Sequence, residues 1–199
     1  MARLAIGVLV GAALLGGPGA ARADEAGSSI VFGAGVSEFG ADGLRDITGP
    51  ATMWEVRFAY VTERSLAFEA AYVGTAQSIE AAGMGQNAAV LSNGAEVNIR
   101  FNAFTDAWQP YAFIGVGWKR YQLMSVDDIF VNEEDQDDVL VLPLGAGVAY
   151  RIGRVVLDLR GSFRIAEGED PMPRMLVSEP KAARRLDTFD LAVHVGWAL

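Results

Sequence analysis

Apolar residues alternate with polar or small residues in runs of about ten positions after residue 24, and no helical spacing persists. This period of two is typical of β-strands that have one apolar face and one polar face. The pattern predicts eight strands. Their expected ranges are Ser29–Phe39, Met53–Val61, Leu66–Thr75, Gly94–Phe104, Gln109–Tyr121, Val139–Ile152, Val155–Ile165 and Thr188–Leu199.

Short and long connections alternate strictly between these predicted strands. The short ones are residues 62–65, 105–108 and 153–154, and the long ones are residues 40–52, 76–93, 125–138 and 166–187. A meander in which every second loop is short is typical of bacterial membrane barrels, whose short turns face the periplasm. We therefore expect an all-β fold, an eight-stranded antiparallel up-and-down transmembrane barrel with a lumen filled by side chains.

One face of the predicted strands carries no charge and has its aromatic residues near the two strand ends. A bilayer selects such belts, because amphipathic rings favour the headgroup levels. A soluble lipocalin-like barrel, with its apolar face inside, has no such need, so we expect the apolar face to contact lipid. The periplasmic belt would comprise Tyr60, Phe68, Phe101, Tyr150 and Trp197, and the outer belt Trp54, Tyr72, Trp118 and Phe189.

The opposite face carries glycines and nearly all charged residues of the strands. Because an unpaired buried charge is costly, we expect these residues to form a network of ion pairs inside the barrel. A narrow gated channel is the alternative. Pro143 lies on a predicted strand and cannot donate a ladder hydrogen bond, so we expect a bulge or local break there. The predicted lumen network comprises Glu55, Arg57, Glu69, Glu96, Arg100, Lys119, Arg151, Asp158, Arg160, Arg164, Asp190 and His194.

The first residues have the layout of a secretory signal peptide. Arg3 precedes an apolar stretch from Leu4 to Leu15, and Ala21-Arg22-Ala23 has the form of a cleavage site. The apolar stretch is shorter than the roughly 18–20 residues that a spanning helix needs. We expect residues 1–23 to be the signal peptide and residues 24–199 to be one barrel domain.

Composition narrows the class of protein further. Removal of Arg3 and Arg22 would change the formal net charge from −9 to −11, which argues against nucleic acid as a partner. The chain contains no cysteine, so disulfides, thiolate metal sites and a lipid-modified N-terminal cysteine are excluded. We expect no cofactor and no metal site.

Three other features could carry chemistry. His194 lies four residues from Asp190 on the polar face, but no serine accompanies it at short spacing, so we expect it to join the lumen network. The acidic residues of loop 125–138 could bind divalent cations, although their spacing does not match a calcium loop. Lys181, Arg184 and Arg185 of loop 166–187 could contact lipopolysaccharide phosphates; otherwise this is an ordinary surface loop.

Two motifs resemble a known superfamily. The last strand has apolar residues at Val195, Trp197 and Leu199, and resembles the signal that the barrel assembly machinery recognises, although such signals usually end in phenylalanine. The segment 109–117, which reads QPYAFIGVG, resembles a run common in small barrels. The chain is thus similar to the superfamily of the outer membrane protein A transmembrane domain and outer membrane protein X.

The resemblance implies a location in the Gram-negative outer membrane. Expected partners are outer-membrane lipid and lipopolysaccharide, the barrel assembly machinery during insertion, and an extracellular ligand that the sequence does not name. We expect a monomer without catalytic activity that serves the envelope or surface interactions through its long outer loops. The alternatives are a narrow passive pore and a lipid A-modifying barrel enzyme.

Overall fold

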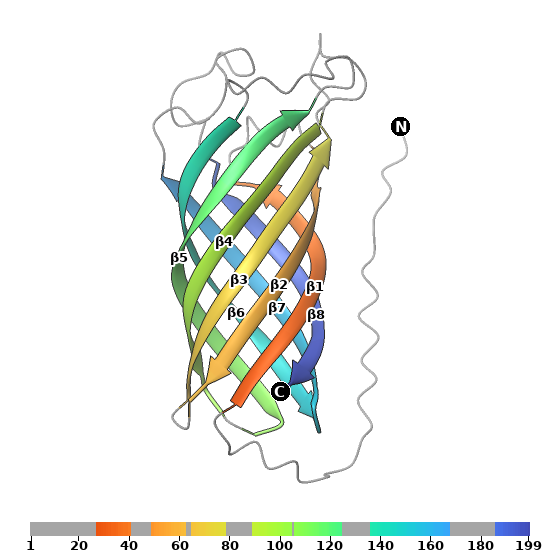
Figure 1. The fold of residues 1–199 in the computed structure, drawn as a ribbon, viewed down its shortest axis with the longest axis vertical. Coiled ribbons are helices and arrows are strands. Elements are labelled where there is room, and N and C mark those ends of the chain that lie inside the picture. Colours follow the sequence, from red (N-terminus) through yellow and green to blue (C-terminus); the bar gives the residue numbers. More distant parts are fainter. Residues whose placement is uncertain are drawn as a thin grey trace.

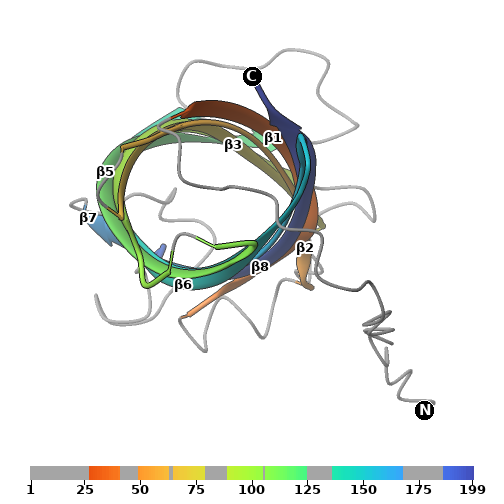
Figure 2. The ribbon, with the colours of Figure 1, turned by 90° about the horizontal axis from the view of Figure 1, so that it is seen from below.

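Eight antiparallel strands pair in sequence order, and β1 also pairs with β8, so the sheet closes into a barrel (Figures 1 and 2). The computed structural model describes residues 27–40, 49–62, 65–78, 89–104, 106–124, 136–167 and 186–199. The predicted eight-stranded barrel is confirmed. The strands are β1 (Gly27–Phe39), β2 (Ala51–Val61), β3 (Leu66–Ser78), β4 (Ala89–Asn102), β5 (Trp108–Met124), β6 (Gln136–Ile152), β7 (Val155–Glu167) and β8 (Thr188–Ala198).

Most strands extend further toward the long-loop end of the barrel than their apolar runs predicted. The largest error is in β4, which begins at Ala89 instead of Gly94. Ala89 pairs with Ser78 of β3 and with Met124 of β5, so backbone hydrogen bonding continues where the alternation of side chains has ended. The alternation of side chains therefore covers only part of each backbone ladder, and the ladder continues beyond it.

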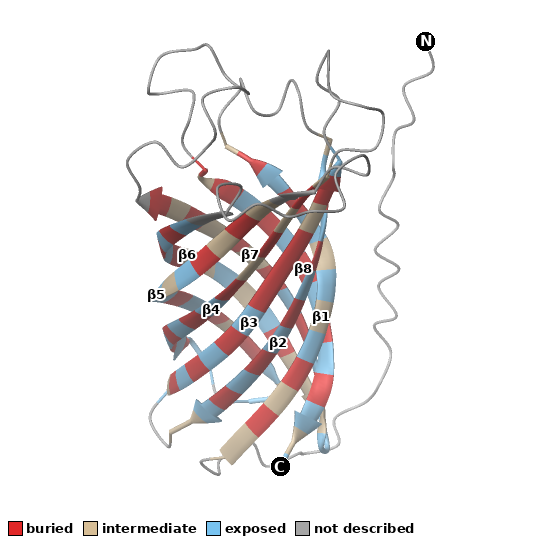
Figure 3. Cartoon of the chain, turned by 45° about the horizontal axis from the view of Figure 1, so that its top comes forward, coloured by how far each residue is buried: buried red, intermediate tan, exposed pale blue. Residues whose placement is uncertain are grey.

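Exposure alternates along most of the length of the strands, as Figure 3 shows by bands of buried and exposed residues. The exposed positions hold large apolar side chains, such as Val97 (57 % exposed) and Val193 (63 %). The intervening positions point into the lumen and hold the buried charged residues. Among the described residues, no helix is long and apolar enough to cross a membrane.

Pro143 of β6 leaves the register of the barrel unchanged. The pairs Ile114–Leu144 and Gly117–Val141 lie on either side of it in the same register, while Pro143 keeps its pairing with Arg164 of β7. The predicted bulge is therefore wrong. Pairing between β5 and β6 is interrupted next to Pro143, because proline has no N–H to donate. This interruption agrees with the other predicted possibility, a local break.

Inward-facing glycines make room for rings in the lumen. A Cβ atom at Gly33 would overlap the ring of His194, and one at Gly147 would overlap the ring of Tyr111. A Cβ atom at Gly145 would likewise overlap the ring of Phe113. The interior is thus packed by large side chains from one strand that lie over glycines of another strand.

Candidate functional site

The candidate site is the lumen, where several ion pairs connect strands that are not neighbours in the sheet. Arg57 of β2 contacts Asp158 of β7, and its Nη1 atom also lies 3.3 Å from Glu55 Oε1. Because β1 and β8 separate β2 from β7, the Arg57–Asp158 pair lies inside the barrel. All three side chains are almost completely buried.

Glu69 of β3 is the centre of this group. Arg160 of β7 donates a hydrogen bond of 2.8 Å from Nη1 to Glu69 Oε2. Arg100 of β4 donates one of 3.4 Å from Nη1 to Glu69 Oε1, and Arg57 Nε lies 3.8 Å from the same oxygen. One carboxylate thus contacts three guanidinium groups that come from three strands.

A second group lies nearer the outer end and centres on Arg164 of β7. Its guanidinium donates to both carboxylate oxygens of Glu96 on β4 and to Asp190 on β8. Since β5 and β6 separate β4 from β7, this contact also crosses the lumen. Arginine suits such contacts because its planar group can bind a carboxylate through two donors.

Aromatic side chains of β5 complete the lumen, and the sequence analysis did not select them. The Tyr111 hydroxyl donates a 2.8 Å hydrogen bond to Asp158 Oδ1, and the Arg100 guanidinium lies 3.7 Å from the Tyr111 ring centre. Arg160 lies 3.3 Å from the ring centre of Phe113. Tyr111 and Phe113 share the strand face of Lys119, so the period of two could have identified them as inward-facing.

The other predicted lumen residues have fewer contacts. His194 Nε2 lies 3.5 Å from Glu55 Oε2, whereas Asp190, its expected neighbour, binds Arg164. Lys119 is buried with its Nζ atom 5.2 Å from the Tyr121 ring centre, and Nζ has no hydrogen-bond partner among the described residues. Arg151 is the second-last residue of β6, and its side chain is half-buried.

The predicted belt residues lie on the outer surface. Eight of them are exposed, and Tyr150 is half-buried because Trp108 packs against it with ring centres 4.5 Å apart. At the other end Phe163 stacks on Phe189 with ring centres 4.4 Å apart. Trp108 and Phe163 were absent from the predicted belts, because Trp108 was assigned to a turn and no apolar face was assigned to the predicted strand that contains Phe163.

The loop features lie almost entirely outside the described residues. This applies to most of the acidic loop 125–138 and to Lys181, Arg184 and Arg185. Asp138 is described and accepts two hydrogen bonds from Arg120, of 2.7 and 2.8 Å. Within the described residues, no group of three or more potential metal ligands comes together.

Comparison with known proteins gives the family. The model of the outer membrane protein beta-barrel domain matches residues 7–198. The chain belongs to this family. It is a protein of the bacterial outer membrane, and proteins of this kind sit in the membrane among lipids and lipopolysaccharide. A search among curated proteins gives no match.

Solved structures of small outer-membrane barrels have the same fold. The attachment invasion locus protein Ail of Yersinia pestis is 14 % identical with a TM-score of 0.55, over 88 % of this chain and 99 % of Ail. Neisserial surface protein A is 14 % identical with a TM-score of 0.56, over 85 % of this chain and 96 % of that protein. The N-terminal barrel of Pseudomonas aeruginosa OprF is 11 % identical with a TM-score of 0.50, over 88 % and 100 %. At these identities the likeness concerns the fold.

Proposed function

We propose that this protein is a non-conducting, non-catalytic outer-membrane barrel that serves the envelope and surface interactions through its four long outer loops. The observation that carries the proposal is the set of ion pairs across the lumen. Arg57–Asp158, Arg160–Glu69 and Arg164–Glu96 each join strands on different sides of the barrel. A solute would have to break these contacts to pass.

The energetics of the lumen support a sealed barrel over a pore. Removing one partner of a buried ion pair leaves a charge without compensation, which costs roughly 3–5 kcal/mol. The lumen network contains several such contacts, with tyrosine and phenylalanine rings stacked against its guanidinium groups. Rearrangement of the lumen to open a channel would break several of these contacts together. The loops, in contrast, can vary without disturbing the barrel.

The surroundings of His194 support a structural role over catalysis in lipid A modification. Its side chain is buried, faces Glu55 and lies over Gly33 inside the barrel. Such an enzyme needs its nucleophile and base to reach a lipid substrate. The closed wall of strands lies between His194 and the lipid.

The last strand supports recognition by the barrel assembly machinery. Val195, Trp197 and Leu199 are all exposed on the outer surface. They form an apolar row that starts on β8, the strand that closes the barrel against β1, and ends at Leu199 directly after it. This row is the part of the chain that we propose the machinery binds during insertion.

Conductance in planar bilayers tests the sealed lumen. We expect the wild-type protein to insert without steady conductance, and a variant with Arg57→Ser and Arg160→Ser, which removes two side chains that cross the lumen, to conduct ions. Gel mobility of unboiled and boiled samples checks that both barrels are folded. Steady conductance of the wild type would favour the pore, and release of acyl chains from lipopolysaccharide would favour the enzyme.

A loop exchange tests the surface role. Short glycine–asparagine turns replace residues 79–88 and 168–185, while the described strands stay intact. We expect the variant to insert normally but to lose the adhesion of expressing cells to immobilised soluble proteins and glycans. An equal loss of adhesion in a variant with altered periplasmic turns, or no adhesion by the wild type, would contradict this role.

A further inference from the structure

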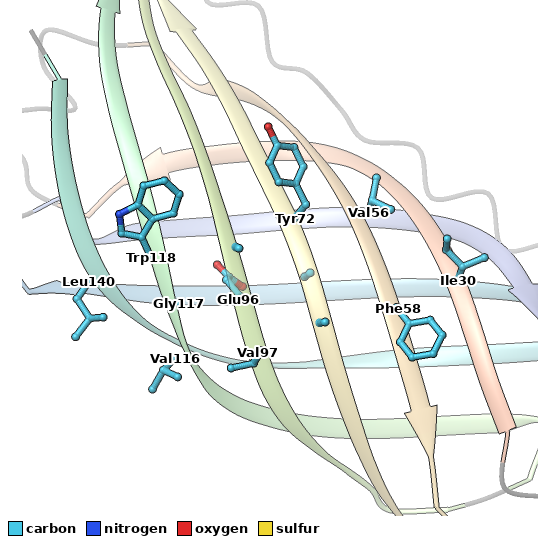
Figure 4. Close-up of a pocket in the computed structure, with 13 residues that line it drawn as sticks. Ile30, Val56, Phe58, Tyr72, Glu96, Val97, Val116, Gly117, Trp118 and Leu140 are labelled. Carbon is cyan, nitrogen blue, oxygen red and sulfur yellow. The ribbon is translucent and has the colours of Figure 1, made fainter. Parts of the chain in front are cut away.

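The lipid-facing surface has a groove over β3, β4 and β5. It has a volume of about 560 Å³ and lies between the ring of Tyr72 on β3 and the ring of Trp118 on β5 (Figure 4). Both rings belong to the outer aromatic belt. A second hollow of about 740 Å³ shares Phe58, Ala70, Val97 and Val116 with the first, so the groove continues toward the periplasmic belt.

The register explains why the surface is hollow here. Ala95 lies directly between Tyr72 and Trp118, because it pairs with both. One row closer to the periplasm, Ala70 lies between Phe58 and Val97. Ala70 and Ala95 are diagonal neighbours on adjacent strands, so two small side chains form an oblique floor between larger walls.

A row of polar residues lies directly beyond the outer end of this groove. Asn93 of β4 pairs with Arg120 of β5, and Arg120 pairs with Asp138 of β6. These residues lie two positions further out than Ala95, Trp118 and Leu140, on the same face of the sheet. Tyr72 connects the two rows, because its hydroxyl donates a 2.8 Å hydrogen bond to Asn93 Oδ1.

Arg120 is held in position above the groove. Its Nε and Nη2 atoms donate to the two oxygens of Asp138, and its guanidinium carbon lies 5.2 Å from the Trp118 ring centre. A guanidinium has five N–H donors, so the pair with Asp138 leaves others available to a ligand. The remaining N–H groups of Arg120 can donate to phosphate oxygens, and the Asp138 carboxylate can accept hydrogen bonds from hydroxyl groups, so the row is suited to a headgroup that has both.

We propose that this surface binds one molecule of lipopolysaccharide through its lipid A part. An acyl chain would lie over Ala95 and Ala70, and the phosphorylated sugars would contact Arg120 and Asn93. Lipid tails are as apolar as the groove, so the hydrophobic effect does not select a lipid here. Selection comes from the fit of the chain between the rings and from hydrogen bonds to the headgroup. Lipopolysaccharide is an outer-leaflet lipid with these headgroup oxygens, and the polar row lies at the outer end.

Native mass spectrometry of the full-length protein in detergent, with purified lipid A as the probe, tests this site. Ala95→Phe fills the groove, and Ala146→Phe is the matched control, since Ala146 is exposed on the lipid-facing surface but does not line the groove. Arg120→Gln removes the headgroup donor, and Arg154→Gln in the turn between β6 and β7 is its control.

We expect one lipid A per wild-type barrel, in preference to phosphatidylethanolamine. Ala95→Phe and Arg120→Gln should each lower lipid A affinity by about tenfold, and the two controls should bind as the wild type does. Gel mobility of unboiled samples shows that each variant is folded. Equal binding of phosphatidylethanolamine, unchanged binding by Ala95→Phe, or a dimer that Ala95→Phe dissociates would each overturn the proposal. None of these outcomes depends on conductance or on the outer loops.

Discussion

At the scale of single residues, the environment of a charge decides what it contributes. Asp158 lies in the lumen and accepts hydrogen bonds from both Arg57 and Tyr111. Asp138 forms an ion pair of good geometry with Arg120, but both side chains are more than two-fifths exposed. Water and salt screen an exposed pair, whereas a buried pair cannot lose one partner without leaving the other unsatisfied.

This contrast predicts different effects of two similar substitutions. Asp158→Asn removes the negative charge beside Arg57 and should lower the free energy of unfolding by about 3–5 kcal/mol. Asp138→Asn, the exposed control, should leave the stability unchanged within error. Urea titration of the protein folded in lipid vesicles measures both values. Equal stabilities of Asp158→Asn and the wild type would contradict a paired interior.

The sequence predicted most charged residues of the lumen, because strand parity places them on one face. It could not predict their partners. Contacts such as Arg160–Glu69 and Arg164–Glu96 join distant strands, and they depend on the tilt of the strands and the closure of the barrel. It also missed Tyr111 and Phe113, since aromatic residues were assigned to the belts and not to the interior.

At the scale of strands, the two faces of each strand lie in different environments, one in contact with lipid and the other in the lumen. On β4, Val97 and Ile99 are exposed while Asn98 between them is buried. The strand ends are where the sequence was least informative. The alternation of apolar and polar side chains fades before the strand ends, but β4 continues to Ala89 because backbone pairing does not need that alternation. Pro143 similarly removes a donor without changing the register.

The position of a lipid-facing residue along its strand sets the cost of a charge. Val97→Arg places a guanidinium near the middle of the apolar band and should cost roughly 2–4 kcal/mol of stability. Ile152→Arg, at the periplasmic end of β6, should cost about 0–1 kcal/mol. Denaturant titrations in one lipid composition give both values. Similar costs at the two positions would contradict the assigned depth of the strands.

At the scale of the whole molecule, closure between β1 and β8 removes every sheet edge, and short turns gather at one end of the barrel. Backbone groups in hydrocarbon must bond to one another, and a closed barrel satisfies this condition through the hydrogen bonds between its strands. The alternation of loop lengths predicted this topology because each strand crosses the whole membrane. The ligand of the long loops is not predictable in the same way, since the strand pattern that specifies the barrel does not specify the loop sequences.

Carbene labelling from the hydrocarbon phase tests the orientation of the two faces most directly. A lipid-soluble diazirine is photolysed in vesicles that contain the folded protein, and labelled residues of β4 are mapped by mass spectrometry. We expect label on Val97 and Ile99 and none on Glu96, Asn98 or Arg100, because only the first set faces lipid. Label on Glu96 and Arg100 with Val97 and Ile99 unmodified would show that the barrel is inside out.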